Sequence, residues 1–121
     1  MKLIFPLIVI GLQTIPTKPV TTDQLPKFDK KPVKVIGKVE KYEERTAKTS
    51  KNQYTVLVLT DAKGKVNVYL HGRPTVKIKN GDKVLVTGLY QKEKKIKDRV
   101  FKNEIDASNE KVKAYGIKLQ K

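Results

Sequence analysis

Alternation of apolar and polar residues between Tyr54 and Gly72 constrains the possible folds of this chain more than any other feature. The segment YTVLVLTDAKGKVNVYLHG predicts a β-hairpin, with a first strand ending at Thr60, a turn over residues 61–64 and a second strand from Val66 to His71. An Asp side chain accepts hydrogen bonds from the amides after it, and Gly tolerates the positive φ that closes such turns. Because side chains alternate across a strand, we expect one face to be buried, formed by Leu57, Leu59, Val66, Val68 and Leu70.

The opposite face of this hairpin mixes polar, aromatic and apolar side chains, namely Tyr54, Val56, Val58, Lys65, Asn67, Tyr69 and His71. That composition favours a ligand platform on this face. A simpler explanation stays open for its members. A tyrosine on a strand is often half-buried packing, and a lone histidine can be a solvated residue at a strand end.

The charge of the chain points to its class of partner. A formal charge of +15, from 27 basic and 12 acidic residues, attracts polyanions, most often nucleic acid and secondarily anionic lipid or acidic protein. The alternative is a lysine-rich surface that only maintains solubility or reflects heat adaptation. A length of 121 residues fits one domain with a modest core. The absence of cysteine excludes disulfides and thiolate metal sites.

The first sixteen residues, MKLIFPLIVIGLQTIP, form a hydrophobic N-terminal segment. One lysine followed by a short apolar run matches a secretory signal or a membrane anchor, which would make the protein exported or envelope-associated. Pro6 interrupts the run and no Ala-x-Ala cleavage site follows, so the alternative is a strand or arm packed on the domain of a cytoplasmic protein. Residues 17–32 are rich in Pro, Thr and Lys, which predicts an extended linker because proline disfavours helix and ladder hydrogen bonds.

Period-two patterns continue through the folded domain, which we expect to span residues 33–107. One face of the first strand carries Val33, Val35, Gly37 and Val39, and the glycine is expected to mark a bulge or sharp coil. We expect a polar loop over residues 43–53, a fourth strand over residues 83–90 whose inward residues include Val84 and Val86, and a charged loop over residues 91–98. The last strand should run from Arg99 to Ala107, with Phe101 and Ile105 in the core, and the basic tail, residues 108–121, adds either an edge strand or no element.

The ordered segments VKVIGKV, LTDAKGKVNVYL, KIKNGDKVLVTG and VFKNEIDA together resemble the OB-fold, over Val33 to about Ala107. The resemblance is to the nucleic-acid-binding OB families of single-stranded-DNA-binding proteins and anticodon-binding domains. It implies an all-β protein, a five-stranded Greek-key barrel whose ligand lies across strands 2 and 3 between the loops joining strands 1 to 2 and 4 to 5. The usual helix between strands 3 and 4 has no room in RPTVKIKNGD, so the N-terminal or C-terminal segment is expected to close the barrel.

The resemblance implies a set of binding residues on those strands and loops. Basic loops with aromatic side chains between them suit single-stranded nucleic acid, which is held by charge and by base stacking. The expected nucleic-acid-binding residues are Tyr54, Asn67, Tyr69, His71, Arg73, Arg45, Lys48, Lys51, Lys92, Lys94, Lys95, Lys97 and Arg99.

Catalytic motifs are missing from the sequence, which has no phosphate-cradling glycine loop, no Gly-x-Ser-x-Gly elbow and no second histidine for a metal site. We therefore expect a binding module with no enzymatic activity, cofactor or metal. The leading hypothesis is binding of single-stranded DNA or RNA with little sequence preference. The alternative is an exported envelope domain that binds a protein, a glycan or an anionic polymer or membrane surface.

Overall fold

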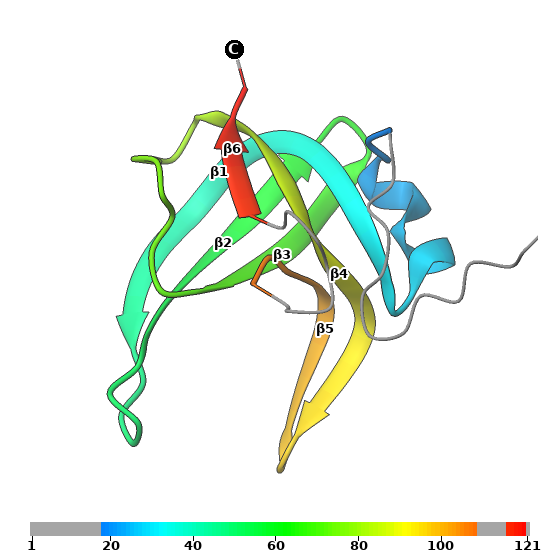
Figure 1. Cartoon of the computed structure of the whole chain (residues 1–121). Helices are drawn as coiled ribbons and strands as arrows, with labels where there is room; N and C mark the ends of the chain where they lie inside the picture. Colours follow the sequence, from blue (N-terminus) through cyan, green and yellow to red (C-terminus); the bar gives the residue numbers. More distant parts are fainter. Residues whose placement is uncertain (1–17, 109–115, 121) are drawn as a thin grey trace, which may run out of the picture.

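The computed structural model describes residues 18–108 and 116–120 (Figure 1). The hydrophobic segment 1–16 and most of the junction before β6 lie outside the described residues. The elements are a 3-10 helix and six strands: η1 (Thr22–Phe28), β1 (Lys31–Thr46), β2 (Gln53–Asp61), β3 (Gly64–His71), β4 (Lys83–Ile96), β5 (Arg99–Asp106) and β6 (Gly116–Leu119). Within the described ranges, no helix has the length and apolar character needed to cross a bilayer.

The strands form a closed barrel in the order β1-β2-β3-β5-β4, and β4 pairs back onto β1. The long β1 makes this closure possible because its first half pairs with β4 and its second half pairs with β2, changing partners at Lys38. A short parallel ladder, centred on Val68 and Ile105, joins β3 to β5. This connectivity confirms the predicted five-stranded OB-fold barrel.

The barrel interior is aliphatic and agrees with the alternation in the sequence. The inward residues predicted for the hairpin and for the first and fourth strands are all buried: Val33, Val35, Val39, Leu57, Leu59, Val66, Val68, Leu70, Val84 and Val86. Ile105 joins this core as predicted. Phe101 does not, since it is only half-buried and lies outside the core cluster.

Gly37 does not mark a bulge, contrary to the expectation from sequence. The β1–β4 register runs through it without interruption, and the irregularity in β1 falls between Glu40 and Glu43, where Lys41 has a φ of 51°. A Cβ at Gly37 would lie 2.7 Å from the Thr60 carbonyl oxygen. The glycine is therefore needed for the close approach of β1 to β2.

The segment expected to be an extended linker contains η1, which packs on β1, β3 and β4 at one end of the barrel (Figure 1). Leu25 is fully buried in the core. Thr22 fixes η1 to the β2–β3 turn, because its amide and hydroxyl donate to the two Asp61 carboxylate oxygens at 2.8 and 2.7 Å. Pro26 lies inside η1, and burial of Leu25 offsets the hydrogen bond that proline cannot make. η1 thus covers one end of a barrel in which the described residues between β3 and β4 form no helix.

Two expected loops are partly strand, over residues 43–46 and 53 in the first and residues 91–96 in the second. The β1–β2 ladder continues to the pair Thr46 and Gln53, and the β4–β5 ladder continues to the pair Ile96 and Arg99. The many charged residues in these segments are compatible with solvent-exposed ladders, so charge alone did not separate loop from strand. The tail contributes β6, which pairs with β4 and buries Ile117, so of the two alternatives the tail adds an edge strand.

Candidate functional site

The β1–β2 and β4–β5 hairpins extend beyond the barrel on the same side and form two arms (Figure 1). A groove of about 850 Å³ lies between the arms, with the outer face of β2 and β3 as its floor. Floor residues are those that alternate with the buried core, namely Tyr54, Val56, Val58, Asn67, Tyr69 and His71. The hairpin that organises the sequence therefore supplies both the core and the floor of this groove.

Aromatic side chains gather at the centre of the groove. Tyr54 and Tyr69 lie on neighbouring strands, with ring centroids 5.7 Å apart and ring planes inclined by 30°. Phe101, on β5 of the β4–β5 arm, also lines the groove. The Lys94 ammonium lies 5.6 Å from the centroids of both Tyr69 and Phe101, so one cation links the floor to the arm.

Lys94 is not a free cation, because its ammonium lies 2.9 Å from the Glu104 carboxylate. The two side chains are 23% and 12% exposed, so most of this ion pair is removed from water. Burial, together with the nearby Asp106 carboxylate, raises the pKa of the Tyr69 hydroxyl. Tyr69 is therefore neutral at physiological pH and can donate a hydrogen bond into the groove.

The β1–β2 arm carries a second internal ion pair. The Arg45 guanidinium donates two hydrogen bonds to Glu43, at 2.8 and 3.0 Å. These bonds lower the pKa of Glu43 and raise that of Arg45, so both groups stay charged across the physiological range. Arg45 reaches the groove with part of its charge already neutralised.

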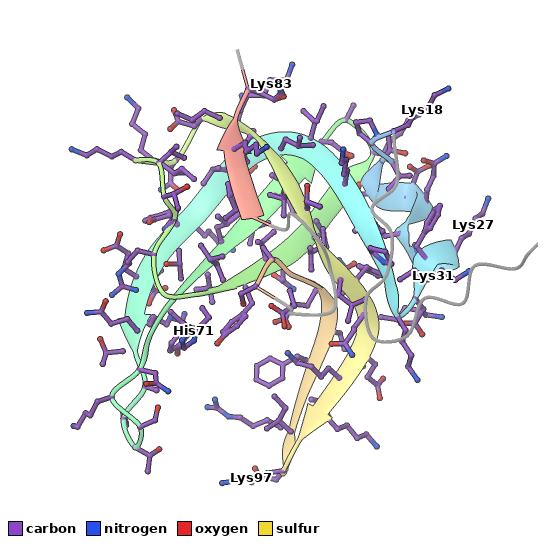
Figure 2. All side chains as sticks on the ribbon, viewed as in Figure 1. Lys18, Lys27, Lys31, His71, Lys83 and Lys97 are labelled. Carbon is purple, nitrogen blue, oxygen red and sulfur yellow. The ribbon has the colours of Figure 1, made fainter. Side chains whose placement is uncertain are left out.

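Seven of the thirteen residues expected from the sequence line the groove: Arg45, Tyr54, Asn67, Tyr69, His71, Lys94 and Arg99. His71 lies at the base of the β1–β2 arm, and Lys97 lies at the tip of the other arm (Figure 2). The remaining six do not line it: Lys48, Lys51, Arg73, Lys92, Lys95 and Lys97. Lys95 alternates with Lys94 along β4 and so lies on the opposite face of the ladder.

Arg73 has a structural role that the sequence did not indicate. Its guanidinium donates to the Tyr54 carbonyl at 2.6 Å and to the Arg45 carbonyl at 3.4 Å, and it lies 3.5 Å from Glu44. These contacts join the connector after β3 to the base of the β1–β2 arm. Arg73 thus supports the groove without lining it.

Phe101 is a functional candidate whose predicted place in the core was wrong. It pairs with Lys94 on the β4–β5 ladder, and Lys94 contacts Tyr69 and Glu104, so Phe101 shares the groove face with them. Between the buried Ile105 and Phe101, Asn103 has a φ of 53°, which breaks the strand alternation and turns Phe101 to the groove. The sequence signal that could have indicated this break is Asn103 itself, since asparagine adopts a positive φ more readily than most residues.

The groove is less basic than the loops expected from the sequence would make it. Its lining contains five basic side chains (Lys41, Arg45, Lys94, Arg99 and Lys102) and three acidic ones (Glu43, Glu104 and Asp106), a net of +2. Two apolar residues near the arm tip, Ile96 and Val100, are 49% and 48% exposed. Across residues 18–108 and 116–120, no cluster of His, Asp or Glu has the arrangement needed to hold a metal ion.

Comparisons with known proteins bear on the fold. No protein-family model matches the chain, and no curated protein matches it in sequence. A yeast Stn1 and Ten1 structure aligns over 74% of this chain and 43% of its own, with a TM-score of 0.50 and 14% identity. The aspartyl tRNA synthetase of Entamoeba histolytica aligns over 95% of this chain and 28% of its own, with a TM-score of 0.54 and 16% identity. The chain thus spans less than half the length of either protein, and the likeness supports the OB-fold.

Proposed function

We propose that this OB-fold protein binds single-stranded nucleic acid, DNA or RNA, in the groove between its two arms. The observation that carries the proposal is the aromatic cluster of Tyr54, Tyr69 and Phe101 in an open groove. Every base has a π-face, so aromatic side chains can stack bases without reading their identity. Binding therefore has little sequence preference.

Charge and fold support the same proposal. Lys41, Arg99 and Lys102 line the groove and have no salt bridge in the part of the chain that the structure describes, so they are suited to phosphate contacts. OB-folds bind oligonucleotides across strands 2 and 3, between the loops that join strands 1 to 2 and 4 to 5. The floor of the groove and its two arms correspond to those parts of the fold. One of the two similar structures is an aspartyl tRNA synthetase, whose name refers to a nucleic acid.

Fluorescence anisotropy with a labelled single-stranded oligonucleotide tests the proposal. Affinity should fall steeply as salt rises, because each neutralised phosphate releases about 0.7 counterion from a single strand. Absence of binding at micromolar protein in low salt would refute it. Phe101→Ala should weaken binding by about 1–3 kcal/mol with an unchanged salt slope, since no cation is removed. Arg99→Gln should instead reduce the salt slope by about 0.7.

Leu119→Ala is the matched control for Phe101→Ala. Leu119 is a 46% exposed apolar residue on β6 that lies outside the groove lining. Its replacement should leave affinity unchanged. If both variants weaken binding equally, the effect reflects general surface hydrophobicity, and Phe101 does not stack a base.

The alternative hypothesis of an exported envelope domain depends on residues 1–16, which lie outside the described structure. No observation on the barrel favours a glycan, a protein or a membrane surface over nucleic acid.

A further inference from the structure

The groove accounts for little of the positive charge of this protein. The chain carries +15, whereas the lining of the groove carries a net of +2. Most of the basic residues therefore lie elsewhere. Their distribution shows where else a polyanion would be attracted.

One concentration lies on the outer face of the sheet formed by the first half of β1, the first half of β4, and β6. Strand register places Lys38 beside Lys83, Lys34 beside Thr87, and Lys118 beside Leu85. We call this surface the lysine face; it comprises Lys34, Lys38, Lys83 and Lys118 with Ile36 and Leu85 between them. Figure 2 shows Lys83 at the end of the barrel opposite the arm tip that carries Lys97.

The lysine face has no compensating acid. Within the described residues, no outward position of these paired segments carries a carboxylate, and none of its four lysines is in a salt bridge. Lys38 and Lys83 are direct cross-strand partners, an arrangement in which like charges repel and destabilise the sheet. A bound anion would remove this repulsion, whereas solvent alone only screens it.

The lysine face is continuous with the groove along β1, β2 and β3. Lys38 pairs with Lys83 on one side and with Thr60 on the other, and Thr60 pairs with Lys65. These outward residues therefore form one continuous row across β4, β1, β2 and β3. The next row along the same strands contains Val58 and Asn67, which line the groove. Two residues along a strand span about 7 Å, so the lysines begin one row beyond the groove floor.

We propose that the lysine face binds the phosphate backbone of the same nucleic acid strand after the strand leaves the groove over Val58 and Asn67. This inference rests on the proposed function of the groove. The contacts are made to phosphates by flexible ammonium groups, so they add affinity and length of binding site without sequence preference. Glu40 pairs with Val58, in the row that the strand crosses as it leaves the groove, and its carboxylate lies 3.8 Å from Lys65, which keeps Lys65 from being a free contact.

Oligothymidylates of two lengths separate the two surfaces. A strand of about 8 nucleotides fits within one OB-fold site, and one of about 24 nucleotides extends beyond it. The test variant is Lys38→Gln/Lys83→Gln/Lys118→Gln, which removes three cations from the lysine face. The matched control, Lys27→Gln/Lys63→Gln/Lys77→Gln, removes three exposed lysines from η1, the β2–β3 turn and the β3–β4 connector. Circular dichroism establishes that both variants fold.

The expected result is a length-dependent loss. For the longer strand, the test variant should bind at least roughly tenfold more weakly than the control, with a salt slope lower by about 2, from three lysines at about 0.7 each. For the shorter strand the two variants should agree within about twofold. Equal losses in the two variants, or an equal loss for both lengths, would overturn the inference while leaving the groove intact. Failure of the unmodified protein to bind either strand would refute the groove, and the inference with it.

Discussion

Replacement of Lys94 by glutamine tests whether this residue positions aromatic rings or contacts phosphate. Its ammonium is 2.9 Å from Glu104, in a pair whose side chains are 23% and 12% exposed. Fully exposed pairs contribute about 0–1 kcal/mol, whereas breaking a fully buried pair costs about 3–5 kcal/mol. Because the Lys94–Glu104 pair is partly buried, the stability cost of Lys94→Gln should lie between these limits. We expect it to lower the free energy of unfolding by about 1–3 kcal/mol.

Most of that loss arises from the Glu104 carboxylate that is left without a partner. Lys94→Gln/Glu104→Gln removes both charges together, so it should be more stable than the Lys94→Gln variant. Urea denaturation of the four proteins in this cycle measures the coupling. Agreement of all four within about 0.5 kcal/mol would show that the ion pair does not form in solution.

Oligonucleotide binding by the same double variant then distinguishes the two roles of Lys94. The variant keeps the net charge of the groove, so a positioning role predicts weaker binding with an unchanged salt slope. If Lys94 contacts a phosphate directly, the slope should fall by about 0.7. That second result would refute the neutralised ion pair described above.

Three further changes test the fold. Leu25→Ala should lower the free energy of unfolding by about 2–5 kcal/mol in urea denaturation, because this residue of η1 is fully buried in the core, whereas replacing a linker residue would be neutral. Asp61→Asn tests pH dependence: burial opposes charge on Asp61, but donors from Thr22 and from the turn hold its pKa below the ordinary 3.8. The stabilisation contributed by the Asp61 carboxylate is fully present above the unfolded-state pKa and is lost as the pH falls through the lower folded-state pKa. The difference in unfolding free energy between the native protein and the Asp61→Asn variant should therefore narrow in acid. Gly88→Ala should lower the thermal midpoint by several degrees, because the added Cβ would lie 2.4 Å from the Asp106 carbonyl oxygen, and an unchanged midpoint would contradict this packing.

Period-two alternation was sufficient to predict which side chains of the hairpin face the core, and the barrel itself was implied by the resemblance to the OB-fold. The hairpin from Tyr54 to Gly72 has one uniformly aliphatic face, and a single-residue shift in register would have exposed it, so the faces were determined. The ends of β1 and β4 were not determined in this way. Their outer halves are rich in charged residues, a pattern that fits a loop and a solvated ladder equally well.

The features that could not be predicted from the sequence depend on tertiary contacts. Pro26 argued against a helix, but burial of Leu25 and the anchoring of Thr22 by Asp61 hold a 3-10 helix there. Phe101 has the sequence parity of the core residue Ile105, but Asn103 lies between them with a φ of 53°, and Phe101 faces the groove. The neutralisation of Lys94 by Glu104 required the two strands to be placed side by side. Such pairings set the charge of the groove, which composition alone overestimated.

The pairing of β1 with β4 determines the order in which this protein can fold during synthesis. Lys31 pairs with Tyr90 and Lys38 with Lys83, so the seam joins segments that are far apart in the chain. Until β4 leaves the ribosome, the first half of β1 has an open edge and the apolar side chains of Val33 and Val35 lack their cover. Loop-closure entropy delays this long-range pairing, which places the protein among slow-folding β-topologies. A chain truncated before β4 should therefore yield an aggregation-prone meander rather than a smaller barrel.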